Sequence, residues 1–387
     1  MRGRRTLRRS ALVVTRGKGF AWLVEALDRA TRARPDALAV LTYHRIADPA
    51  GSQLLYPGLI SAGPSEFEEQ MRFLAARHRP LALGELLAVR RGEARLPLRS
   101  VLVTFDDGYR DFAEDAWPIL KRHGIPVVLF VPTAYPGDPG RSFWWDRLYS
   151  ALSLAGPTRA METPVGTLPL VSSDDRAAAY RRLRTLVRSL PHEDAMRVVD
   201  DVCHSLGAPP TQSTVLSWPE LGRLHFEGVV LAPHSRTHPL LDRVPLETAR
   251  EEIVGSLEDL AREIGSVPRV FAYPAGGENA EVARVLGEEG FELGFTTERG
   301  RNDLREADWL RLRRINVGRA STLALLRAQL LPWWKGSRSN EGGSRIPNTC
   351  PSNTLLQSDR FLERPGPSRG IDRSGSTADT NLKGRVN

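Results

Sequence analysis

Residues 101–111 have the sequence VLVTFDDGYRD, in which a short apolar run is followed at once by two aspartates and a glycine. Such a run, closed by a turn signal, is typical of a strand buried in a parallel sheet, and ligands of α/β folds gather at the carboxyl ends of these strands. Adjacent carboxylates repel unless a cation or a proton lies between them. Asp106 and Asp107 therefore indicate an ion site, or else only the cap of the following helix.

A second apolar run, residues 229–233, is followed by HSRTHP, which places His234 and His238 four positions apart. On a helical turn or in a tight loop, this spacing presents both imidazoles to one point. Two imidazoles suit a divalent metal, and one of the two aspartates can supply a third ligand. The spacing also arises by chance, with either ring only bonded to a carbonyl. The aspartate pair elsewhere in the chain favours the metal site.

Together these motifs resemble those of the polysaccharide deacetylase family (NodB homology, carbohydrate esterase family 4), and the resemblance extends over residues 36–331. In that family the aspartate pair supplies the catalytic base and one metal ligand, and the two histidines supply two more. By this resemblance Asp106 is the base. The ligands that the resemblance implies for a divalent metal, which we expect to be zinc, are Asp107, His234 and His238.

The segment FAYPAGG at residues 271–277 resembles the family's loop of proline, aromatic residue and glycine, although an alanine follows the proline here. By the resemblance this loop binds substrate through Tyr273 and Pro274. The resemblance also makes the backbone N–H of Ala275 a donor to the oxyanion that forms during acyl transfer.

Two functional positions of the family carry different residues here. An arginine that precedes the loop proline by two positions is replaced by Ala272, and Arg314 is a candidate substitute that would orient the base. A Leu-x-x-His motif is also missing, since no histidine follows His238. Permuted branches of the family carry Tyr-His at the first strand, which Tyr43-His44 matches. We expect His44 to be the general acid, with a buried structural histidine as the alternative.

Strand and helix patterns alternate along the chain, which predicts a parallel α/β architecture. Strands are predicted at residues 37–42, 101–105, 126–131, 229–233, 269–273 and 292–297, and residues 309–317 close the fold. The family resemblance implies a distorted (β/α)7-type barrel. Over residues 134–215 the rhythm is interrupted, and we expect a helical insertion there, with an amphipathic helix over 176–197. Its tryptophans either pack against the body or stack on a sugar.

Charge is distributed unevenly along the 387 residues. The formal net charge is +8, but residues 1–18 carry seven basic and no acidic side chains, and residues 336–387 carry eight basic against five acidic. Residues 19–335 are therefore left at −2, which excludes a basic nucleic-acid platform. We expect a basic N-terminal segment at 1–35, a deacetylase-like domain at 36–331 and a disordered tail at 336–387.

No segment approaches the ~20 consecutive apolar residues of a transmembrane helix. The apolar run at residues 11–14 is too short for the core of a signal peptide. We therefore favour a cytoplasmic or membrane-peripheral location, with the basic N-terminus in contact with a membrane surface as one option. An extracytoplasmic location stays open, because two cysteines do not settle the redox compartment.

The sequence thus predicts a metal-dependent hydrolase that removes N-acetyl groups from a glycan or glycolipid containing an amino sugar. Two alternatives stay open. The same metal site could hydrolyse another linear amide or an ester, or the chain could be an inactive glycan-binding relic of the fold. Retention of Asp106 beside Asp107 weighs against a relic, because binding alone does not need the second carboxylate.

Overall fold

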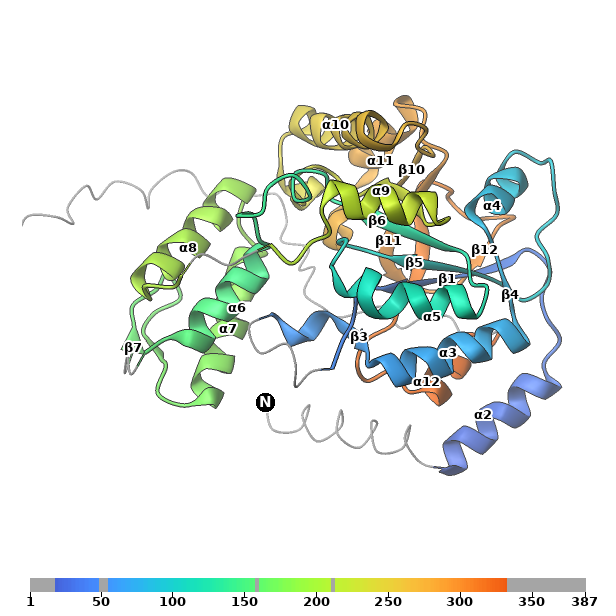
Figure 1. Ribbon diagram of the computed structural model, residues 1–387, viewed down its shortest axis with the longest axis horizontal. Helices are drawn as coiled ribbons and strands as arrows, with labels where there is room; N and C mark the ends of the chain where they lie inside the picture. The colour runs from blue at the N-terminus through green and yellow to red at the C-terminus, as the bar shows by residue number, and fades with distance from the viewer. Residues whose placement is uncertain (1–17, 49–54, 157–159, 210–212, 333–387) are drawn as a thin grey trace, which may run out of the picture. The chain divides into compact units, whose positions relative to one another are not determined.

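A parallel sheet of seven main strands forms the body of the protein (Figure 1). The computed structural model describes residues 18–48, 55–156, 160–209 and 213–332. The basic residues 1–17 and the predicted tail at 336–387 lie outside the described residues. In the order of pairing, the strands are β10 (Val270–Ala272), β11 (Leu293–Arg299), β13 (Leu312–Asn316), β1 (Ala37–Tyr43), β5 (Ser100–Phe105), β6 (Val127–Val131) and β9 (Val230–Pro233).

The sheet curves into an incompletely closed barrel. Its two end strands, β9 and β10, lie beside each other, and the ring Nδ1 of His234 is 2.7 Å from the carbonyl oxygen of Ala272. Short strands extend the sheet at its rim, where β12 (Asn302–Asp303) pairs with β1 and β4 (Arg79–Pro80) pairs with β5. The predicted distorted (β/α)7-type barrel is confirmed, and residues 309–317 supply its seventh strand.

The barrel interior is filled by every second residue of the strands, because side chains alternate between the two faces of a sheet. On β1, Leu38 and Val40 belong to an apolar cluster to which all seven strands contribute. The cluster includes Leu83 and Leu86 of α4 (Leu83–Arg90), which follows β4 at the amino ends of the strands. Nearer the carboxyl ends, the inward positions become polar, beginning with the buried Thr42 and Thr104.

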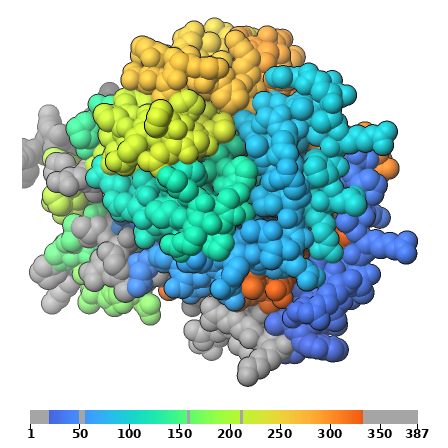
Figure 2. Space-filling model, turned by 45° about the vertical axis from the view of Figure 1, so that its right-hand side comes forward, coloured from blue at the N-terminus to red at the C-terminus, as the bar shows by residue number. Residues whose placement is uncertain are grey.

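The outward residues pack under a layer of helices that forms a second apolar cluster. Figure 2 shows α3 (Pro64–Arg77), α5 (Trp117–Arg122), α9 (Trp218–Phe226) and α10 (Leu246–Ile264) side by side on one face. The other covering helices are α11 (Ala280–Glu288) and α12 (Leu323–Gln329), and α2 (Lys18–Ala30) packs on α12. Among the described residues, none of the helices combines the length and the apolarity that crossing a membrane requires.

Three helices between β6 and α9 form a separate group beside the barrel (Figure 1): α6 (Trp144–Leu154), α7 (Ser173–Val187) and α8 (His192–Ser205). We call these three helices the insertion; they fall within the predicted range 134–215. They share a small core of their own, with a two-stranded hairpin of β7 (Ala160–Met161) and β8 (Leu168–Pro169). The helical stretch predicted over 176–197 is divided between α7 and α8, because the helix ends before Pro191, which caps α8.

Candidate active site

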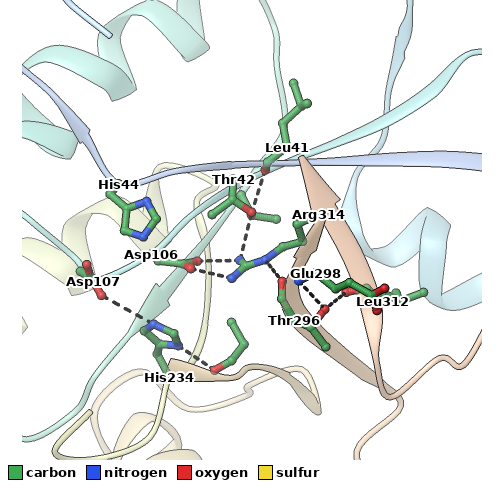
Figure 3. Close-up of polar contacts among 12 residues, drawn as sticks. Leu41, Thr42, His44, Asp106, Asp107, His234, Thr296, Glu298, Leu312 and Arg314 are labelled. Atoms are coloured by element: carbon green, nitrogen blue, oxygen red, sulfur yellow. Dashed lines mark hydrogen bonds and ion pairs between the residues drawn. The ribbon is translucent and has the colours of Figure 1, made fainter. Parts of the chain in front are cut away.

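Four candidate residues emerge at the carboxyl ends of three parallel strands (Figure 3). Asp106 and Asp107 follow β5, His44 follows β1, and His234 follows β9. The side chains of His44 and Asp106 point into the barrel, because each residue stands two positions after an inward threonine. These threonines, Thr42 and Thr104, are paired in the sheet. The parallel arrangement therefore gathers these side chains at one edge, as the strand-end motifs predict.

Asp106 is held by a buried arginine. Arg314 donates Nη1–H to Oδ1 of Asp106 at 2.8 Å and Nη2–H to Oδ2 at 2.7 Å. Its Nε–H is directed to the carbonyl of Thr296 at 2.8 Å. Burial alone would raise the pKa of Asp106, but the charge and the hydrogen bonds of Arg314 hold that pKa below its usual range. The pair thus fixes an ionised carboxylate in one orientation.

Asp107 faces both histidines of the downstream motif. Its Oδ1 lies 3.6 Å from Nε2 of His234 and 3.3 Å from Nε2 of His238. All three side chains are buried, and their potential ligand atoms lie within 4.8 Å of one another. The same Oδ1 is buried without a hydrogen-bond partner, which is costly unless a cation occupies the space that it faces. One carboxylate, with an oxygen that lacks a partner, and two imidazoles form a ligand set that fits a divalent metal.

The backbone around these ligands adopts uncommon conformations. Asp107, Ser235 and His238 have φ angles of 74°, 63° and 61°, in the left-handed region that residues other than glycine rarely occupy. Strain of this kind persists where the surroundings enforce it, and it clusters at functional sites. Here the turns direct the carboxylate and the second imidazole toward one point.

The orientation of His234 is set by its second ring nitrogen. Because the carbonyl of Ala272 can only accept, the contact at 2.7 Å places a proton on Nδ1. Nε2 is then left with a lone pair directed toward Asp107, as a metal-binding imidazole requires. The backbone carbonyl of Ala272 therefore supports one candidate ligand.

A glutamate that the sequence analysis missed shapes the histidine loop. Glu252 of α10 accepts the backbone N–H of Arg236 at 2.7 Å and that of Thr237 at 2.8 Å. It also accepts the hydroxyl of Thr237 at 2.6 Å. This carboxylate lies in a long charged helix, where nothing in the sequence separates it from exposed neighbours such as Glu251.

Aromatic residues of the insertion close around His238. The rings of Trp145 and Phe143 contact the imidazole edge-on, with centroids 5.0 and 5.7 Å away. Trp145 is buried and donates its indole N–H to the hydroxyl of Tyr109 at 2.8 Å, which favours packing as its role. Both tryptophans line the pocket, but Trp144 is only half-buried.

Asp146 fastens the insertion to the barrel. It accepts the hydroxyl of Tyr109 at 2.6 Å and the backbone N–H of Tyr56 at 2.7 Å. Burial raises the pKa of Asp146 to about 6, even though both hydrogen bonds act to lower it. Tyr109 belongs to the strand-end motif itself, so the insertion is tied directly to the segment that carries the two aspartates.

One pocket contains the candidate residues, with an empty volume of about 830 Å³ that includes open solvent. His44 lines it together with Asp106 and Asp107, and Figure 3 shows its ring near both carboxylates. Ala275, in a tight turn with φ 48°, lines it as well. The insertion completes the wall with several side chains that the sequence analysis missed, among them Arg184 and His192.

Two predicted substrate-binding side chains are not brought into this pocket. Tyr273 is buried and donates its hydroxyl to the carbonyl of Leu310 at 2.8 Å, and Pro274 is also buried. Neither lines the pocket. Of that loop, the structure therefore presents Ala275, because Tyr273 lies on the outward face of β10 and packs with Phe271 in the apolar cluster under α10 and α11.

Comparisons with known proteins agree with the fold. Residues 94–294 match the family described as polysaccharide deacetylase. The poly-beta-1,6-N-acetyl-D-glucosamine N-deacetylase of Escherichia coli K12 is 22% identical over 278 residues, covering 70% of this chain and 36% of the relative. The enzyme of the same name from Staphylococcus aureus MSSA476 is 35% identical over 79 residues, 20% of this chain and 27% of the relative. The chain thus spans about a third, or less, of the length of these relatives.

Two solved structures are similar to the protein. The Streptococcus pyogenes deacetylase PplD, in complex with acetate, has a TM-score of 0.52 and 18% identity, covering 77% of this chain and 100% of that one. IcaB from Ammonifex degensii has a TM-score of 0.50 and 20% identity, covering 78% and 100%. At these identities the likeness concerns the fold alone.

Proposed function

Because the chain belongs to the polysaccharide deacetylase family, we propose that it is a metal-dependent hydrolase that removes N-acetyl groups from an amino-sugar-containing glycan or glycolipid. The observation that carries the proposal is the juxtaposition of an ionised Asp106 with the buried cluster of Asp107, His234 and His238 in one pocket. This arrangement supplies both a proton acceptor and a ligand set for hydrolysis.

Asp107, His234 and His238 would hold the metal. One carboxylate and two imidazoles leave open positions at a divalent ion, which is the pattern of catalytic rather than structural sites. When bound there, such an ion lowers the pKa of a water ligand and polarises a carbonyl. The same ligands accept several divalent metals, and zinc is the one that we propose.

Asp106 is proposed as the general base that receives a proton from the attacking water. Arg314 keeps its carboxylate ionised and oriented, and each oxygen retains a second lone-pair direction for the incoming proton. Arg314 does not line the pocket, so its proposed role is to position Asp106 from behind.

Stabilisation of the oxyanion is assigned to Ala275, and protonation of the departing amine to His44. The backbone N–H of Ala275 would donate to the oxyanion of the acetamide, since this residue lines the pocket in a turn at the end of β10. His44 would protonate the departing amine, because its half-buried ring lines the same pocket beside both aspartates.

A glycan-binding relic is less consistent with the site than an enzyme. An ionised carboxylate at Asp106, 3% exposed, is costly to bury, and Arg314 offsets that cost without adding a group that a ligand could touch. No feature of the pocket favours another linear amide or an ester over an acetamido sugar.

Acetate release tests the proposal. The protein would be incubated with β-1,4- and β-1,6-linked N-acetylglucosamine oligomers and with peptidoglycan fragments, with and without a chelator. We expect acetate from at least one substrate, loss of that release with chelator, and recovery on adding a divalent metal. Protein that binds one equivalent of metal and releases no acetate from any of these substrates would refute the proposal.

A further inference from the structure

We infer that the substrate carries an anionic group next to its acetylated sugar, bound by arginines of the insertion and of the loop after His238. This inference rests on the proposed function and names the substrate class of the same site. The shared chemistry is a phosphate ester or a carboxylate, of which a sugar phosphate and a uronic acid are the two sources.

The outer part of the pocket is lined by basic side chains from two elements. Arg184 projects from α7 of the insertion, Arg188 is the residue that caps the end of α7, and Arg243 ends the short 3-10 turn that follows the histidine loop. Among the described residues that line the pocket, the only acidic ones are Asp106 and Asp107. This part of the pocket lining is therefore cationic, although residues 19–335 as a whole carry a formal charge of −2.

Neither of those aspartates neutralises the outer arginines. Both oxygens of Asp106 accept from Arg314, and Asp107 faces the two histidines. A divalent cation at Asp107 would make the inner part of the pocket more positive still. A low-dielectric pocket with one sign of charge concentrates ligands of the opposite sign.

Among these arginines, Arg184 is the one best placed to bind an anion. It is half-buried, its guanidinium lies 5.8 Å from the centre of the Tyr56 ring, and it forms no ion pair with any carboxylate in the described part of the chain. The Nε of Arg243 lies 3.6 Å from Oδ2 of Asp242. Both side chains are solvent-exposed, and exposed ion pairs of this kind contribute little to stability. A planar guanidinium matches phosphate and carboxylate oxygens in pairs.

The position of Arg184 relative to the catalytic groups is fixed by packing. Leu183, the residue before it, belongs to the core that α7 shares with α6. At the start of α6, Trp145 contacts His238 and Asp146 bonds Tyr109. The half-buried Trp144 lines the same pocket and offers a face on which a sugar ring can stack. An acetamido sugar at the aspartates would thus leave its anionic neighbour near the arginines.

The test compares binding of matched ligands to the Asp106→Asn variant, whose turnover is blocked. The ligands are N-acetylglucosamine 1-phosphate, a disaccharide of glucuronate and N-acetylglucosamine, and neutral N,N′-diacetylchitobiose, measured by calorimetry. We expect at least one anionic ligand to bind ten-fold or more tightly than the neutral one, because a hydrogen bond to a charged group is worth roughly that much. The preference should shrink as salt is raised.

Arginine variants identify the contact. Adding Arg184→Gln or Arg243→Gln should remove most of the preference and leave affinity for the neutral disaccharide unchanged. Arg181→Gln is the matched control, since Arg181 is exposed on the same helix and does not line the pocket. Equal affinity for all three ligands would overturn the inference. So would a preference that survives both substitutions, because the anion would then be bound at the metal site itself.

Turnover by the wild-type protein separates this inference from the proposed function. A charge preference in binding without acetate release from any substrate would refute the deacetylase and leave the anion site intact. Acetate release with the same kcat/KM on neutral and anionic sugars, unchanged by Arg184→Gln, would support the deacetylase and refute the anion site.

Discussion

Arg314 and Asp106 form a two-point ion pair across the inside of the barrel, although 208 residues separate them in the chain. Their strands are not neighbours, because β1 lies between β13 and β5 in the sheet. The guanidinium therefore reaches past β1 within the barrel, where it is 1% exposed. The carboxylate proposed as the base is thus held by a strand that comes more than half the chain later.

The pair makes a prediction for stability. Arg314→Met should destabilise the protein by about 3–5 kcal/mol, because it leaves the charge of Asp106 buried without its partner. Asp106→Asn in the same chain should restore much of that loss, since no charge then remains. Urea unfolding of the two single variants and the double variant measures the coupling. Strictly additive effects would show that the two side chains do not depend on each other.

Substitutions of the two aspartates should differ in their effect on metal content. Asp106→Asn should keep near-normal metal while kcat falls by about 10²–10⁴-fold, because the base is lost and the three proposed ligands are unchanged. Asp107→Asn should weaken metal binding itself, and His234→Ala or His238→Ala should do the same. Elemental analysis and acetate release report the two properties independently. If Asp106→Asn lost the metal and Asp107→Asn retained it, the proposed roles would be reversed.

His44 should behave as a general acid. His44→Gln should lower kcat by about 10²–10⁴-fold and keep both metal and fold. Substrates whose leaving groups need no proton should be hydrolysed at nearly the wild-type rate. His192 is the other half-buried histidine of the pocket outside the metal cluster, so His192→Gln is assayed in parallel. A loss confined to His192→Gln, or equal impairment of His44→Gln on both kinds of substrate, would contradict the assignment.

Glu252 should support the metal site without touching it. Glu252→Ala removes the acceptor of two backbone N–H groups and one hydroxyl in the histidine loop. Partners of this kind typically contribute 10–100-fold to metal affinity, and we expect a loss in that range in competition with a chelating dye. Glu251→Ala, at the exposed neighbouring position, is the control. Unchanged affinity in Glu252→Ala would mean that the loop keeps its shape without this anchor.

Asp146 should make stability depend on pH. Its pKa is raised to about 6 in the folded state, so the folded protein binds this proton more tightly than the unfolded chain does. The contribution is complete below pH ~4 and is lost as pH rises through 6. At 1.36 kcal/mol per pKa unit, it amounts to about 3 kcal/mol.

Other carboxylates, such as Asp107, have a lowered pKa and change the stability in the opposite direction as the pH rises. Comparison with the isosteric variant Asp146→Asn isolates the contribution of Asp146 from theirs. We expect the unfolding free energy of the wild type, relative to that of Asp146→Asn, to decrease between pH 4 and 6 and then level off. Urea unfolding of chelator-treated protein across that range provides the measurement. A pH-independent difference would place the titration of Asp146 outside this range.

The sequence by itself determined the strands and the strand-end motifs. Apolar runs with turn signals are local, and parallel strands must bring their carboxyl ends to one edge, so Asp106, His234 and His44 could be placed together in advance. The alternation of side chains along β13 also predicts the direction of Arg314. This residue stands two positions after the inward Leu312 and therefore points into the barrel as well. That signal distinguishes it from Arg313, which is exposed.

Only the tertiary structure decided which side chains meet. Strand order places β13 beside β1, and this pairing depends on contacts between segments far apart in the chain. Glu252 and Arg184 lie on helices whose charged residues look alike in sequence, because helical periodicity marks the buried face and not the partner of each polar group. Trp144 and Trp145 are adjacent and both line the pocket, yet Trp144 is half-buried whereas Trp145 is buried against His238. Local patterns encode the element and its faces, whereas the partner across the molecule is set by packing.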